Sequence, residues 1–68
     1  MYNWTIETHQ GQAGAWVGVV KHRTNSVQVN FMSNWHPTAM FAFLECLQWL
    51  QLNNESVKDS EPRFVNVA

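Results

Sequence analysis

The sequence is poor in charged residues and in cysteine. It contains four basic and five acidic residues among 68, which gives a formal net charge of −1. So little positive charge argues against nucleic acid and anionic membranes as partners, because both are recognised through clustered basic residues. The single cysteine, Cys46, excludes an internal disulfide and is typical of a reducing, intracellular setting.

Two kinds of hydrophobic segment are also missing. No basic N-terminal segment precedes an apolar run, and no uncharged apolar run reaches the length of about 18 residues that a membrane span needs. We therefore expect no signal peptide, no membrane span and a cytoplasmic location. Hydrophobic residues make up 46% of the sequence, and aromatic residues, which include four tryptophans, make up 13%. This composition is too apolar for a disordered segment.

Alternating residues in the first half of the chain predict a small sheet. Residues 2–8 and 27–32 alternate between apolar and polar with a period of two, which is typical of half-buried strands. Residues 15–22 are apolar on both faces until Lys21, which suits a central strand. The polar segment 23–26 predicts a tight hairpin turn. Because consecutive strands usually pair, we expect a three-stranded antiparallel meander.

A helix is predicted from Pro37 to Asn53 or Asn54. Proline suits the first helical turn, and either Asn34 or His36 would lie near the N-cap. One stripe about 120° wide collects five apolar side chains, namely Met40, Phe43, Leu44, Leu47 and Leu50. We expect this stripe to pack on one face of the sheet, formed by Val17, Val19, Val27, Val29 and Phe31. Trp16 and Val20 would then lie on the open face.

Gly18 interrupts the apolar strand at 15–22. It predicts either a bulge or a place where a large ring, such as that of Trp4, crosses the strand. Large rings such as those of Trp4 and Trp16 also help a small domain to bury enough area.

The C-terminal residues predict a linker and a short strand. Residues 55–62 are polar and charged, so they read as a linker, and residues 63–68 are either an edge strand or a loose tail. Phe64, Val65 and Val67 favour the strand, because they would be unusual in a free tail. Residues 1–68 are thus expected to form one small α+β domain. Its predicted order is β-β-β-α-β, with the fourth strand optional.

No pattern of residues predicts a catalytic, cofactor or metal site. His9, His22 and His36 are widely spaced, and none forms a close ligand pair with Cys46. A cysteine in the middle of a helix beside an apolar stripe is usually a small buried hydrophobe rather than a nucleophile. We therefore expect no enzyme, no cofactor and no metal.

The basic cluster at Lys21, His22 and Arg23 has two interpretations. It is either an ordinary solvated hairpin tip or, together with Trp16, a contact for a phosphate backbone and a stacked base. Four basic residues in all make nonspecific nucleic-acid binding weak. Lys21 and Arg23 are therefore predicted as a secondary contact only.

The back of the predicted helix carries few charges. Glu45 is the only charged residue there, whereas a solvated helix face normally carries several. Aromatic residues are enriched at interface hot spots, because they bury a large area at a low entropic cost. The predicted partner-binding surface consists of Trp35, Phe41, Glu45, Trp49 and Leu52.

In size and character the chain resembles phage-encoded inhibitors such as anti-CRISPR proteins, although no shared motif carries the resemblance. It implies a non-enzymatic module that occupies a surface of a larger intracellular protein complex, in the cytoplasm of a bacterial host. One alternative is a nucleic-acid-associated regulator or antitoxin-like domain. Another is a structural homodimer in which the backs of two helices pair.

Overall fold

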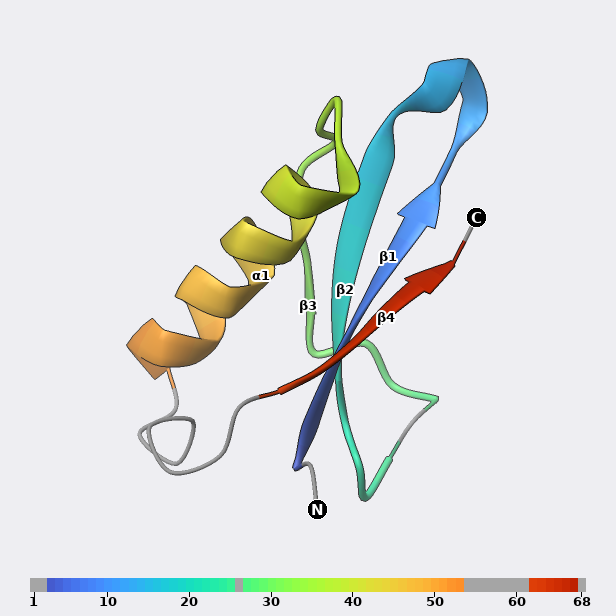
Figure 1. Ribbon diagram of the computed structural model, residues 1–68. Helices are drawn as coiled ribbons and strands as arrows, with labels where there is room; N and C mark the ends of the chain where they lie inside the picture. The colour runs from blue at the N-terminus through green and yellow to red at the C-terminus, as the bar shows by residue number, and fades with distance from the viewer. Residues whose placement is uncertain (1–2, 26, 54–61, 68) are drawn as a thin grey trace.

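The computed structural model describes residues 3–25, 27–53 and 62–67, which form a mixed sheet and one helix. The elements are β1 (Trp4–Gln10), a 3-10 turn η1 (Gln12–Gly14), β2 (Trp16–His22), β3 (Phe31–Met32), α1 (Ala39–Asn53) and β4 (Arg63–Val67). The strand order is β3-β2-β1-β4, and α1 packs on the sheet (Figure 1). β2 pairs antiparallel with β1 and β3, and β4 runs parallel to β1. The predicted α+β fold with its C-terminal strand is confirmed.

In β2, the side that α1 covers is the opposite of the predicted one, whereas Phe31 of β3 packs against the core on the helix side, as predicted. Ile6 pairs with Val20, and both side chains are completely buried in a core cluster with Trp4, Cys46 and Leu50. Because side chains alternate along a strand, Val17 and Val19 lie on the face without the helix. The prediction that these two valines contact the helix, with Val20 and Trp16 on the open face, is therefore wrong. The strand is apolar on both sides, so its pattern does not distinguish them.

Gly18 explains how the helix approaches the sheet. A Cβ atom at this position would lie 2.6 Å from the sulfur of Cys46 and 2.8 Å from the carbonyl oxygen of Ala42. The backbone of α1 therefore rests against β2 at Gly18, so the glycine marks a helix contact rather than a bulge or a crossing ring.

This contact also sets the rotation of the helix. The buried stripe consists of residues four apart: Ala42, Cys46 and Leu50. Phe43 and Leu47 are only partly buried, and the predicted core residues Met40 and Leu44 are exposed. The prediction is therefore confirmed for Leu50 and for Phe43 and Leu47, which pack against the core, and it is wrong for Met40 and Leu44, because the helix is rotated about its axis.

The third strand is shorter than predicted. The regular ladder between β3 and β2 contains only Phe31 and Met32 among the described residues, and Val27 and Val29 are exposed rather than packed under the helix. Asn25 accounts for part of this difference, because its side-chain oxygen accepts a hydrogen bond from the Gln28 N–H at 3.3 Å. A local side-chain turn of this kind competes with the strand ladder.

The helix begins after Thr38. The Thr38 hydroxyl oxygen accepts a hydrogen bond from the Phe41 N–H at 3.3 Å, which is the contact of an N-cap residue. The predicted caps, Asn34 and His36, are therefore wrong, and Pro37 lies before the helix. The helix ends at Asn53, as expected. Within the described ranges, no helix has the length and apolar character needed to cross a membrane. Most of the predicted linker, residues 55–61, lies outside those ranges.

Candidate functional site

The outer face of α1 is exposed, largely apolar and uncharged. Four apolar side chains lie on it: Met40, Phe41, Leu44 and Leu52, with exposed fractions of 60%, 54%, 46% and 77%. Gln48 and Gln51 share the same arc of about 120° and are also exposed. We call these six residues the helix outer face. A contiguous apolar surface of this kind is typical of an interaction site.

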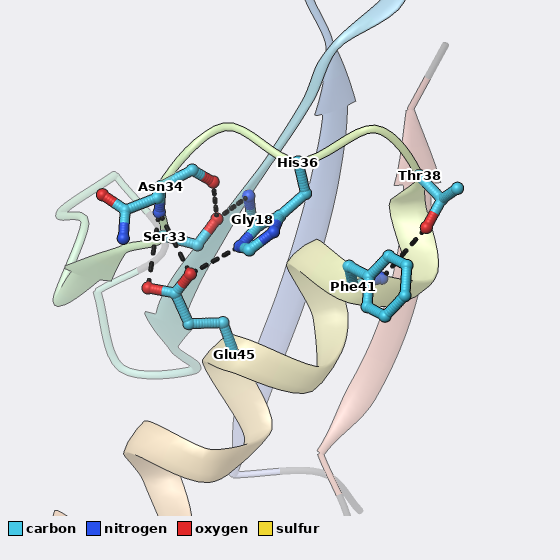
Figure 2. Close-up of polar contacts among 7 residues, drawn as sticks. All are labelled: Gly18, Ser33, Asn34, His36, Thr38, Phe41 and Glu45. Carbon is cyan, nitrogen blue, oxygen red and sulfur yellow. Dashed lines mark hydrogen bonds and ion pairs between the residues drawn. The ribbon is translucent and has the colours of Figure 1, made fainter.

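Glu45 borders this face and fastens the helix to the preceding segment. Its carboxylate oxygen Oε1 lies 2.6 Å from His36 Nε2, and the Asn34 N–H donates to both carboxylate oxygens at 3.3 and 3.4 Å. Figure 2 shows Glu45 reaching from α1 toward both residues. We call these three residues the Glu45 clamp. The side chains of Glu45 and His36 are each 26% exposed, so water only partly screens their interaction.

Ser33 joins the clamp to the sheet. The Gly18 N–H donates to the Ser33 hydroxyl oxygen at 2.7 Å, and the Ser33 N–H donates to the Gly18 carbonyl oxygen at 2.8 Å. The Ser33 hydroxyl in turn donates to the carbonyl oxygen of Asn34 at 2.8 Å (Figure 2). The segment before α1 is therefore fixed to both layers, which holds the outer face in one orientation.

Trp49 belongs to the margin of the core and is not a free surface ring. It stacks on Phe31 of β3, with ring centroids 5.0 Å apart and planes within 11°. The other aromatic contacts among the described residues are also pairs: Trp4 with His22, His36 with Phe41, and Phe43 with Phe64. Among the described residues the rings do not gather into the single aromatic surface that the sequence predicts.

Trp35 lies on a different part of the surface. A Cβ atom at Gly11 would come within 2.7 Å of the Trp35 ring, so the indole rests on the β1–β2 connection and is still 60% exposed. Its neighbour His36 pairs with Trp16 and contacts Glu45 on the helix side of the sheet. Because side chains alternate along an extended segment, Trp35 points to the opposite side.

The secondary contact residues Lys21 and Arg23 lie at the end of β2. Lys21 Nζ is 3.2 Å from Glu7 Oε1, and His9 Nε2 is 3.0 Å from the same oxygen. Burial by itself raises the pKa of Glu7, but the hydrogen bonds and charges of His9 and Lys21 outweigh it, so this pKa is lowered. The positive charge of Lys21 is therefore paired with the carboxylate of Glu7 on the neighbouring strand. Arg23 is exposed, and its backbone N–H donates to the Asn3 carbonyl oxygen at 3.0 Å.

Cys46 has the properties of a packing residue. Burial raises the pKa of its thiol to about 12, and the negative charge of Glu45 adds to this effect. A thiol with this pKa stays protonated near neutral pH and is a poor nucleophile. Within residues 3–25, 27–53 and 62–67, no three His, Cys, Asp or Glu side chains come together as a metal site.

The structure brings together only part of the predicted surface. Phe41 and Leu52 lie on the helix outer face, Glu45 and Trp49 lie at its borders, and Trp35, Lys21 and Arg23 lie elsewhere. Sequence reasoning missed Met40 and Leu44. The small residues Gly18, Ala42 and Cys46 are the sequence feature that could have shown the correct rotation of the helix. Ala42 and Cys46 face the sheet where the helix approaches Gly18.

Comparisons of the chain with protein-family models, with curated proteins and with solved structures find no match.

Proposed function

We propose that the protein is a non-enzymatic binding module that inserts the helix outer face into an apolar groove of a larger intracellular protein. The observation that carries this proposal is the exposure of Met40, Phe41, Leu44 and Leu52 on one uncharged side of a fixed helix. An amphipathic helix laid in a groove typically anchors through residues three and four apart, and Met40, Leu44 and Phe41 have this spacing. The two glutamines add hydrogen-bonding groups at no cost in buried charge.

The fixed position of α1 supports a binding role. The Glu45 clamp and the close contact at Gly18 hold the helix before any partner arrives. A preorganised surface loses less conformational entropy on association, so more of the contact energy is available as affinity. In this proposal Glu45 and Trp49 position the face, whereas Phe41, Leu44, Met40 and Leu52 contact the partner.

The proposed action is that of a small inhibitor or regulator that covers part of a larger complex, as in the phage-encoded inhibitors that the chain resembles in size. The high pKa of Cys46 supports a role without nucleophilic catalysis. The buried free thiol of Cys46 supports a reducing cytoplasmic setting, because thiols stay reduced in that compartment.

The proposal is tested by capturing a partner from a bacterial lysate with the tagged protein and identifying it by mass spectrometry. Phe41→Ala and Leu44→Gln should each weaken binding to the purified partner by about 2 kcal/mol, the usual scale of a hot-spot residue. Both side chains are roughly half exposed, so the thermal melting temperature should stay close to that of the parent.

Matched controls are Val27→Gln and Met32→Gln, which remove exposed apolar side chains elsewhere on the molecule. If these controls weaken capture as much as Leu44→Gln does, the helix outer face is not the binding surface. If Leu44→Gln converts a dimer to a monomer without affecting capture, the face instead joins two copies of the chain.

A further inference from the structure

The two edges of the sheet differ in how they are protected. At one edge, β3 pairs over only Phe31 and Met32, and the chain then leaves the regular ladder at Ser33 before His36 pairs with Trp16. Short and irregular edges of this kind resist further strand pairing. At the other edge, β4 pairs with β1 over five residues in regular register. Among the described residues, no strand lies on the outer side of β4 (Figure 1).

β4 lacks the usual protection of an edge strand. Its sequence from Arg63 to Val67 contains one charge and neither proline nor lysine, and Phe64 and Val67 are exposed at 46% and 38%. Natural proteins commonly protect a long edge with lysine, proline or a bulge, because its unpaired N–H and C=O groups form a template for another strand. The chemistry of this edge therefore specifies a β-strand as its occupant.

The Phe64 side chain is only partly covered by its neighbours in the chain. It pairs with Ile6, so it lies on the helix side of the sheet, and its ring centroid is 4.8 Å from that of Phe43. α1 lies mainly over β1 and β2, which leaves the helix side of β4 at the margin of the covered area. A strand added outside β4 would bring new side chains next to Phe64.

We propose that β4 pairs antiparallel with β4 of a second copy of this chain, about a two-fold axis at Val65. This register pairs all five residues: Val65 faces Val65 of the second copy, Phe64 faces Asn66, and Arg63 faces Val67. The axis is perpendicular to the sheet, so both helices lie on the same side of one continuous sheet. The two Phe64 rings then lie diagonally across the new strand pair on that side, within reach of each other.

The charge of β4 favours this self-pairing. The two Arg63 side chains lie at opposite ends of the strand pair, roughly 14 Å apart along the strand at about 3.4 Å per residue. This exceeds the Debye length of about 8 Å at physiological ionic strength, so their repulsion is largely screened. Parallel pairing would instead place the two arginines side by side. The single charge on β4 thus selects the antiparallel arrangement.

The contact is small, so the dimer is expected to be weak. Five residues from each copy fall below the interface of about 1,200 Å² that stable complexes usually bury. Sedimentation of the whole protein should therefore show a monomer–dimer equilibrium between low micromolar and millimolar concentration.

Substitutions at Val67 test the proposed register. Val67→Glu places a carboxylate opposite Arg63 of the second copy, whereas Val67→Lys places a like charge there. Both remove the same apolar side chain, so they form a matched pair. Two equivalent contacts per dimer should separate their dissociation constants by about tenfold, with the Glu variant the tighter. Thermal melting of both variants checks that the monomer fold is retained.

A charge swap gives an independent check. In the double variant Arg63→Glu with Val67→Lys, each new lysine faces the new glutamate of the second copy, so dimerisation should recover relative to Val67→Lys alone. A monomer at every concentration, or equal dissociation constants for the two Val67 variants, would overturn the proposal. A protein that stays monomeric but loses captured partner with Val67→Lys would overturn it in favour of strand addition by that partner.

Discussion

The two faces of α1 are both apolar, yet one is in the core and the other is exposed. The buried face carries Ala42, Cys46 and Leu50, and the outer face carries the larger side chains of Met40, Phe41 and Leu44. The faces therefore differ in side-chain size more than in polarity. The small side chains face the sheet because Gly18 allows the helix backbone to approach it closely. Hydrophobicity identifies a core only when the opposite face is polar.

This comparison has an energetic consequence. A small domain has a free energy of unfolding of only about 5–15 kcal/mol, so each buried contact of the helix is a large part of the total. The exposed apolar side chains on the outer face add little to that total. Their exposure is the reason for the proposal that this face binds a partner.

The largest expected effect comes from truncating one leucine on each face of α1, Leu50 on the buried face and Leu44 on the outer face. Leu50→Ala should lower the free energy of unfolding by about 2–5 kcal/mol, because it leaves a cavity in the core. Leu44→Ala should change it by less than about 0.5 kcal/mol, as expected for an exposed position. Urea unfolding followed by tryptophan fluorescence measures both. Similar losses for the two variants would show that the assigned faces are wrong.

The close contact between helix and sheet predicts the next largest effect. Gly18→Ala should destabilise the protein by about 1–3 kcal/mol, because the added methyl group meets the Ala42 carbonyl oxygen and the Cys46 sulfur. The same unfolding assay measures this loss. A variant with the stability of the parent would mean that α1 does not rest on β2 at this point.

The Glu45 clamp should contribute less than the core contacts. Glu45→Gln keeps the size of the side chain but weakens its bonds to His36 and the Asn34 N–H, so a loss of roughly 1–2 kcal/mol is expected. In the unfolding assay, Gln48→Glu is the control for a change of charge at an exposed position of the same helix. The proposed role in positioning predicts that Glu45→Gln also weakens partner binding, and unchanged binding would restrict the clamp to stability.

The smallest predicted effect concerns pH and the face of the sheet without the helix. The pKa of Glu7 is lowered in the folded protein, so its ionised form stabilises the fold above the ordinary value of 4.5, and this contribution is lost as the pH falls through the folded pKa. Glu7→Gln should therefore reduce stability at neutral pH by less than about 1 kcal/mol. The difference from the parent should disappear in acid. Thermal melts across this pH range measure it, and a difference that grows in acid would contradict the assignment.

Much of the fold could be predicted from local patterns. Alternation identified β1, the apolar run identified β2, and Phe64, Val65 and Val67 indicated β4. The existence of the helix and its end at Asn53 also followed from the sequence, because periodicity and stop signals act over neighbouring residues. For the candidate site, the scarcity of charge on the helix pointed to a binding face, with Phe41 and Leu52 placed on it.

The orientation of these elements depended on the tertiary structure. A strand apolar on both sides and a helix apolar around most of its circumference can pack in more than one way, and their periodicity does not choose among them. The choice is made by contacts between residues distant in the chain: Gly18 with Ala42 and Cys46, and Glu45 with Asn34 and His36. In the structure, the helix side that carries the small residues Ala42 and Cys46 faces Gly18, which leaves Leu44 on the surface and places Val20 in the core.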